Sequence, residues 1–177
     1  MAVQMDSDRG DVDRSDVASL TGLATALWDV RDAMGDVLFK LATERLIVTA
    51  GEVRWLSAAN RALEDSLDHL RSLELIRAME ADAAASAAGL PPGATLAALA
   101  HQVPEPWSGM LLGHRSALLE LAGEIASSAD ENRRLLDAGS RQLRDTLNSI
   151  TASTGVYDAK GVTQSAADRL RRLDEQA

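Results

Sequence analysis

The stretch that decides the fold is LTGLATALWDVRDAMGDVLFKL, residues 20–41. Its large apolar residues recur at alternating spacings of three and four along the whole stretch. This spacing is typical of an α-helix that packs along another helix through one face. We therefore predict a helix over residues 16–50 that supplies one side of the core. The apolar stripe consists of Leu20, Leu23, Leu27, Val30, Met34, Val37 and Leu41.

A second helix is predicted over residues 52–87, almost directly after the first. Gly51 separates the two apolar runs, and glycine suits the left-handed backbone at a helix C-terminus. The connection is either a hairpin turn or a kink in one bent helix, and its shortness favours an antiparallel hairpin. The apolar residues of the second helix share one face: Leu56, Ala59, Leu63, Leu67, Leu70, Leu73 and Ile76.

Prolines divide the rest of the chain. The run Pro91-Pro92-Gly93 ends helical structure, and Pro104 ends a short helix predicted over residues 95–101. Pro106 suits the first turn of a last helix over residues 105–152, in which no further proline occurs. The sequence thus predicts an all-α fold over residues 16–152, an elongated antiparallel helical hairpin packed with a long C-terminal helix in a coiled-coil-like bundle.

Both ends of the chain are expected to be flexible. Residues 1–15 contain several aspartates among small polar residues and have few apolar groups to bury. This composition is typical of disorder. Residues 153–177 begin with small polar residues and are predicted to form a loop and a flexible tail, which includes a basic segment around Arg169.

The composition excludes several classes of protein. The chain has no cysteine, which rules out disulfides and thiolate metal sites. A formal net charge of -9 opposes binding to nucleic acid or anionic lipid. No apolar run reaches the roughly 20 residues of a membrane span, and the N-terminus does not resemble a signal peptide. We expect a cytoplasmic protein without a nucleic-acid partner.

The residue pattern also offers no arrangement for catalysis. The three histidines, His69, His101 and His114, are the side chains best suited to proton transfer near neutral pH. None follows the Glu-x-x-His spacing of di-iron bundles, and we expect them at surface or half-buried helix positions. Phosphate-binding loops and nucleophile elbows are absent from the sequence. We predict no enzymatic activity, no cofactor and no metal.

The last predicted helix has an interrupted apolar stripe. Ser128, Asn132 and Gly139 break it, and further apolar residues follow. A helix patterned in this way is poorly specified as a core element, whereas an exposed apolar face is suited to binding another amphipathic helix. Packing of this half on the first hairpin is the alternative, and the pattern leaves both open. The apolar residues concerned are Leu136, Leu143, Leu147 and Ile150.

The order of these features resembles the FlgN-type flagellar export chaperones. After the long hairpin come four short motifs in the family's order, over a resemblance that extends from about Leu20 to Gly161. The last motif, a tyrosine loop after a small-residue linker, is the most specific, although each is weak alone. The motifs are LPPGATL at 90–96, PEPW at 104–107, ENRRLL at 131–136 and VYDAKG at 156–161.

The resemblance implies a cytoplasmic chaperone that binds the C-terminal helices of the hook-filament junction proteins FlgK and FlgL and delivers them to the flagellar type III export apparatus. It places the cargo on the long C-terminal helix, at Leu136, Leu143, Leu147 and Ile150. It also assigns binding of the export-gate protein FlhA to Tyr157, with Asp158 and Gly161 shaping the turn. The basic tail after Gly161 has no role in this resemblance.

A different class of function competes with the chaperone hypothesis. The unbroken stripe from Leu20 to Leu41 has a length suited to self-pairing, which would favour a homo-oligomeric coiled-coil scaffold or adaptor protein. Against it, the flanking positions lack a regular alternation of charge. The sequence pattern therefore leaves self-association open.

Overall fold

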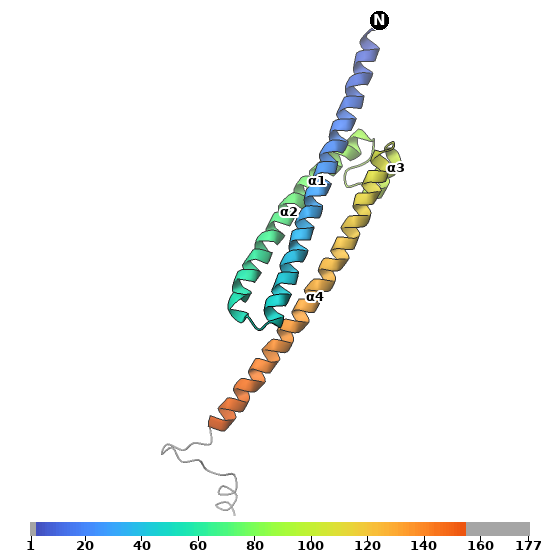
Figure 1. The fold of residues 1–177 in the computed structure, drawn as a ribbon. Coiled ribbons are helices and arrows are strands. Elements are labelled where there is room, and N and C mark those ends of the chain that lie inside the picture. The colour runs from blue at the N-terminus through green and yellow to red at the C-terminus, as the bar shows by residue number, and fades with distance from the viewer. Residues whose placement is uncertain (1–2, 155–177) are drawn as a thin grey trace, which may run out of the picture. The chain divides into compact units, whose positions relative to one another are not determined.

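The structure is a computed structural model that describes residues 3–154, with side chains described from 16 to 150. It contains four α-helices and one 3₁₀ turn, and no strand occurs in the described part of the chain (Figure 1). The predicted all-α class is confirmed. The elements are α1 (Val3–Thr49), η1 (Val53–Trp55), α2 (Leu56–Ala87), α3 (Leu96–Gln102) and α4 (Trp107–Thr154).

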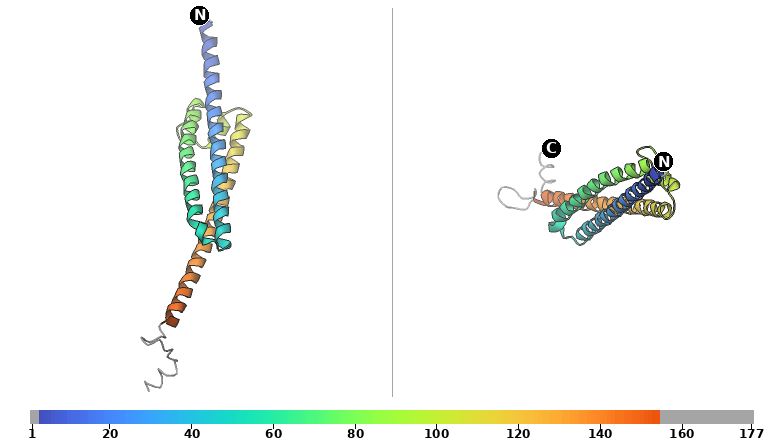
Figure 2. Two further views of the ribbon diagram at one scale, coloured as in Figure 1. Left: turned by 60° about the vertical axis from the view of Figure 1, so that its left-hand side comes forward. Right: turned by 90° about the horizontal axis from the view of Figure 1, so that it is seen from above.

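The chain divides into two units, residues 1–132 and 133–177, and the boundary falls within α4. In the first unit α1 and α2 run antiparallel and side by side, and α3 and the first part of α4 complete the packing (Figure 2). Of the second unit, the structure describes only the end of α4.

Gly51 is a hairpin turn and not a kink. Its φ of 71° is in the left-handed region, which suits a residue without a side chain. Its N–H donates to the Val48 carbonyl (3.1 Å), and the next N–H, of Glu52, donates to the Ile47 carbonyl (3.0 Å). These two bonds form a Schellman motif, which satisfies carbonyls left open at the end of a helix. The chain therefore reverses into α2 after α1 is properly capped.

The same motif ends α2 at Gly89, which has φ 71°. Its N–H donates to Ser86 (3.1 Å) and the N–H of Leu90 to Ala85 (2.8 Å). Further on, the Thr95 hydroxyl caps α3 by accepting from the Ala98 N–H (3.1 Å). Helix ends in this chain are thus set by glycine and by a capping hydroxyl, both of which act locally.

Helix α1 starts earlier than the sequence indicated. We expected disorder over residues 1–15, whereas the backbone is helical from Val3 onward. Extending a formed helix adds one hydrogen bond for each residue that is ordered, and this stretch contains no proline. Met1 and Ala2, and residues 155–177 of the predicted C-terminal loop and tail, lie outside the described residues.

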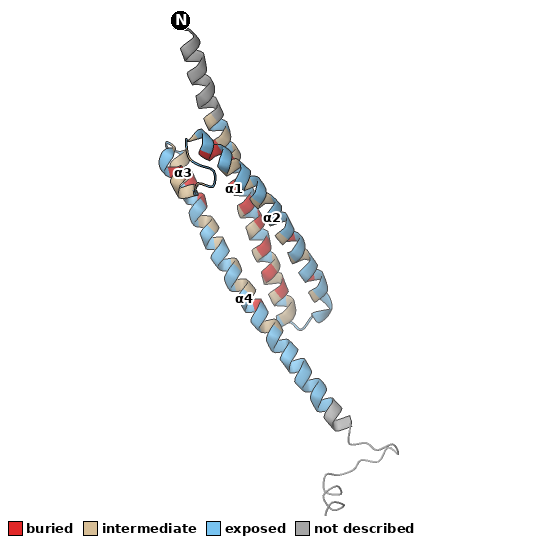
Figure 3. Ribbon diagram, turned by 180° about the vertical axis from the view of Figure 1, so that it is seen from behind, coloured by how far each residue is buried: buried red, intermediate tan, exposed pale blue. Residues whose placement is uncertain are grey.

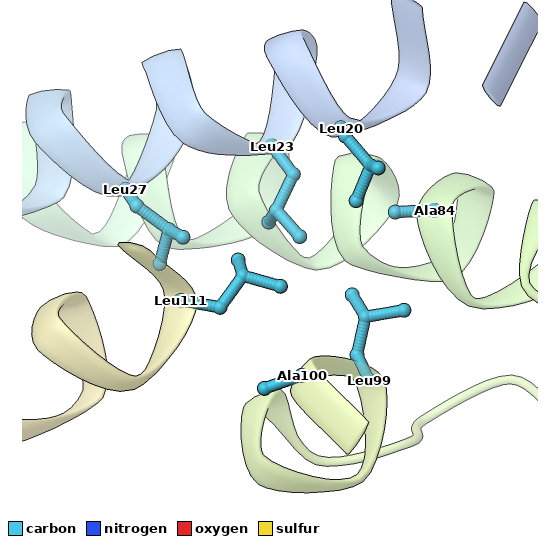
Figure 4. Close-up of a cluster of buried hydrophobic side chains, with 7 residues drawn as sticks. All are labelled: Leu20, Leu23, Leu27, Ala84, Leu99, Ala100 and Leu111. Atoms are coloured by element: carbon cyan, nitrogen blue, oxygen red, sulfur yellow. The ribbon is translucent and has the colours of Figure 1, made fainter. Parts of the chain in front are cut away.

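The buried residues concentrate along α1 (Figure 3). Of its predicted stripe, every member is buried except Met34, which is half-buried. A cluster of buried apolar side chains joins all four helices and lies where α3 and the start of α4 meet the α1–α2 pair (Figure 4). On α2, by contrast, Ile76 is exposed, so the predicted apolar face of that helix is only partly covered. The cluster consists of Leu20, Leu23, Leu27, Ala84, Leu99, Ala100 and Leu111.

A buried polar network joins three helices at the other end of the first unit. The Asn132 amide of α4 is 3 % exposed, and its Nδ2 donates to the Leu41 carbonyl (2.8 Å) and to Glu44 Oε2 (2.7 Å) of α1. Asn60 of α2, with its amide nitrogen turned toward Glu44, donates to the other carboxylate oxygen (3.0 Å). A buried carboxylate is costly without donors, so this geometry holds α2 and α4 to the same point of α1.

An ion pair flanks this network at the surface. Arg45 of α1 donates to Glu131 of α4 at 2.6 Å, and both side chains are largely exposed to solvent. Exposed pairs contribute little to stability, so the pair serves mainly to orient the helices. Asn132, which the sequence suggested as a break in the apolar stripe, is therefore a point of attachment. Its amide has donors that match a carbonyl and a carboxylate on α1.

His114 is buried as well, contrary to the expected surface or half-buried position. Its ring, on α4, meets the Trp28 ring of α1 edge-on, with centroids 4.9 Å apart. The Arg31 guanidinium lies 4.4 Å from the centroid of the same indole. Burial, and secondarily the positive charge of Arg31, hold the pKa of His114 below its ordinary value of 6.5. The imidazole is therefore neutral at physiological pH.

The central cluster makes a first prediction. Leu27→Ala removes a fully buried side chain, and we expect the free energy of unfolding to fall by about 2–5 kcal/mol. Leu75→Ala, at a position that is 70 % exposed, is the control and should change it by less than about 0.5 kcal/mol. Urea unfolding followed by circular dichroism measures both. Equal effects would show that Leu27 is not part of the core.

His114 makes a second prediction. Because its pKa is lower in the folded chain than in the unfolded chain, the unfolded state binds more protons below pH 6.5. The stability present above that pH is lost as the pH falls through the folded pKa. We expect the free energy of unfolding to drop as the pH falls below about 6.5, and His114→Leu to flatten this drop. A variant with the same pH dependence as the natural chain would exclude His114 as its source.

Candidate functional site

The predicted cargo residues lie on the last part of α4, in the second unit. Leu143, Leu147 and Ile150 are 63 %, 61 % and 55 % exposed, and Leu136 is half-buried. At about 100° per residue, the four side chains fall within about 60° of one another around the helix. They form one apolar row, interrupted by Gly139 between Leu136 and Leu143, which we call the α4 apolar row.

The row is set among polar residues. Serine, arginine, glutamine, aspartate, threonine and asparagine occupy the other positions of residues 140–149, so that the apolar atoms are confined to one side. The Thr146 hydroxyl donates back to the Gln142 carbonyl (2.9 Å), which uses its hydrogen-bonding capacity within the helix. This geometry offers an amphipathic helix as a binding surface and contains no group suited to bond chemistry.

The residues predicted to contact the export gate are not placed by the structure. Tyr157, Asp158 and Gly161 lie outside the described residues, as does the basic segment around Arg169. Their assignment stays a prediction from the sequence.

The hollows of the first unit give no sign of an active site. One, of about 330 Å³, lies between α1, α2 and the start of α4, with Asp16 as its only charged lining residue. The other, of about 480 Å³, lies between α1 and α2 and is lined by Asp29, Asp32, Asp36, His69 and two apolar residues. In the part of the chain with described side chains, no group of acidic and histidine residues is arranged to hold a metal ion.

The acidic hollow nevertheless has a defined charge. The Ser66 hydroxyl donates to the Asp36 carboxylate, which holds the pKa of Asp36 below its ordinary value of 3.8. Burial opposes this shift, and the charge of Lys40, 3.5 Å from Asp36, adds to it. Asp36 is therefore a carboxylate and not a proton donor near neutral pH. The hydrogen bond also links α2 to α1.

Sequence reasoning found the apolar row but missed Asn132 and Glu44. The role of Asn132 could in part have been predicted, because a polar residue at a core position of a helix often fixes the register of the helix packed against it. The partner Glu44, however, is 88 residues away from Asn132 in the sequence.

Among residues 3–154, no helix is long and apolar enough to cross a membrane.

Comparison with known proteins adds the decisive observation. The model of the family described as FlgN protein matches residues 19–165, which cover the hairpin, α3, α4 and the sequence motif at 156–161. No curated protein and no solved structure matches the chain. The family match covers most of the chain and includes all four sequence motifs. The chain belongs to the FlgN family of flagellar export chaperones.

Proposed function

We propose that this chain binds the C-terminal helices of FlgK and FlgL on the α4 apolar row, in the cytoplasm, and delivers them to the flagellar type III export apparatus. The observation that carries the proposal is a row of exposed leucines on α4 in a member of a chaperone family. Cargo helices that later pack together in the assembled structure have apolar faces, and such faces need cover before assembly.

The physical basis is burial of apolar surface. Leu143 and Leu147 are each exposed by more than half, and apolar surface removed from water stabilises a complex by about 25 cal/mol per Å². Ordering the partners offsets part of this gain, so the interaction is reversible, as delivery requires. A small set of side chains in one row carries much of the affinity at such surfaces.

The rival scaffold hypothesis loses its main support. It depended on the stripe from Leu20 to Leu41 as a surface for pairing with a second copy. The chain's own helices cover that stripe, and Leu23 and Leu27 are fully buried. The stripe is therefore not available for self-pairing in the folded chain.

Export-gate binding is the second element of the proposal. We assign it to Tyr157, with Asp158 and Gly161 expected to shape a turn, because this segment of the sequence falls within the family match and contains the only tyrosine of the chain. A tyrosine offers a large ring together with a hydroxyl for hydrogen bonding, and this combination is common at binding hot spots.

Charged substitutions test the α4 apolar row as the cargo-binding surface. The double variant Leu143→Asp, Leu147→Asp should weaken capture of purified FlgK and FlgL by roughly tenfold or more, because it puts carboxylates into an apolar interface. Leu119→Asp, on the same helix and 59 % exposed, is the matched control and should bind normally. Circular dichroism should show unchanged helicity in both. Undiminished capture by the double variant would place the cargo elsewhere.

The division between cargo and gate is tested separately. Tyr157→Ala should abolish binding to the cytoplasmic part of FlhA and leave FlgK capture intact, since the two contacts are proposed at different residues. Tyr157→Phe, which retains the ring, separates the ring's contribution from that of the hydroxyl. Loss of FlgK binding in Tyr157→Ala would contradict this division of roles.

A further inference from the structure

The aromatic residues of this chain lie mostly at its surface. There are only five, three tryptophans, one tyrosine and one phenylalanine. Trp28, Phe39 and Trp55 are 52 %, 64 % and 55 % exposed, whereas Trp107 packs beside the central cluster. Large aromatic side chains are usually the first to be buried, and exposed ones are enriched at binding surfaces. The placement of Trp28 and Phe39 therefore calls for a physical explanation.

These two residues belong to a second apolar stripe on α1. All the exposed large apolar residues of that helix are separated by close to whole numbers of turns, at about 3.6 residues each. Val37, which is buried, lies half a turn away from both Trp28 and Leu46. The stripe is therefore on the side of α1 opposite its buried stripe. Its members are Val17, Trp28, Phe39 and Leu46.

Small residues separate the large ones along this surface. Ala24, Gly35 and Ala42 fall within the same sector of about 60°. At Gly35 an added Cβ would meet no atom within 4 Å, so the space above the helix is open. Large residues alternating with small ones create the hollows into which side chains of another helix fit. We call these seven residues, from Val17 to Leu46, the α1 back face.

One edge of the α1 back face is negatively charged. Asp29, Asp32 and Asp36 are exposed there and line the hollow of about 480 Å³ between α1 and α2. Asp36 is already paired with Lys40 and accepts a hydrogen bond from Ser66, so the charge offered to a partner comes mainly from Asp29 and Asp32. On the other edge, Arg31 lies over the Trp28 ring and is engaged within the molecule. An apolar strip beside a row of carboxylates is complementary to a helix with an apolar face and basic residues along one side.

The charge also distinguishes between possible occupants. A second copy of this chain has the same acidic edge and the same net charge of -9, so approach of two copies is opposed by repulsion. We propose that the α1 back face binds an amphipathic helix of a protein partner, with lysine or arginine side chains directed at Asp29 and Asp32. This site is separate from the α4 apolar row, and its test does not depend on the cargo proposal.

The experiment uses a labelled synthetic helix with leucines on one face and arginines along one edge, and the same peptide with glutamates in place of the arginines. Fluorescence anisotropy with the full chain should show that the arginine peptide binds roughly tenfold or more tightly than the glutamate peptide. The preference should shrink as salt is raised, because salt screens exposed charges.

Variants at Gly35 locate the binding surface. Gly35→Arg fills the open space and adds a repelling charge, so it should weaken binding of the arginine peptide by roughly tenfold or more. Gly35→Ala also restricts the backbone at this position but adds only a methyl group, so it should bind the arginine peptide normally. Leu75→Asp changes an apolar position on α2 that is 70 % exposed and lies outside the α1 back face, so it should also bind the arginine peptide normally.

Three results would overturn the proposal. The first is binding of both peptides with equal affinity, or of neither. The second is unchanged binding of the arginine peptide by Gly35→Arg. The third is a dimer in light scattering that Gly35→Arg dissociates, which would show that a second copy occupies the α1 back face.

Discussion

Burial of one stripe on α1 is the interaction on which the rest of the structure depends. Leu23, Leu27 and their neighbours are covered by α2, α3 and the first part of α4 together. Because the chain has few aromatic residues, its core consists of leucine, valine and alanine, and these fill a layer between helices but not a thick interior. Every other helix of the first unit is placed by its contact with this stripe.

The polar network at Glu44 adds specificity to that packing. Apolar contacts between helices tolerate sliding, whereas a buried carboxylate between two amides accepts only one arrangement. Asn60 and Asn132 reach Glu44 from α2 and α4, so the three helices share one register. Asn132 is also the last residue of the first unit, and beyond it α4 presents Leu143 and Leu147 to solvent.

Membership in the FlgN family of export chaperones directs attention to binding surfaces. Amphipathic helices with exposed apolar rows offer such surfaces. Helix α1 has two apolar stripes: a buried one that stabilises the fold, and an exposed one on its opposite side. The chain thus offers two apolar surfaces with different surroundings, one polar and one acidic.

The sequence by itself determined the all-α class, the chaperone family and the positions at which helices end. These depend on local chemistry: apolar spacing, glycine at 51 and 89, and the prolines near 91 and 104. It also placed Leu136, Leu143, Leu147 and Ile150 on one face, because helical spacing is enough for that.

Only the tertiary structure decided that Gly51 reverses the chain, that His114 and Asn132 are buried, and that Trp28 and Phe39 are exposed. Burial depends on which distant segment packs over a residue. The sequence on either side of that residue does not predict which segment this is. Asn132 contacts Leu41 and Glu44, which are 91 and 88 residues away in the sequence, and the side of α1 left open depends on where α2 and α4 pack.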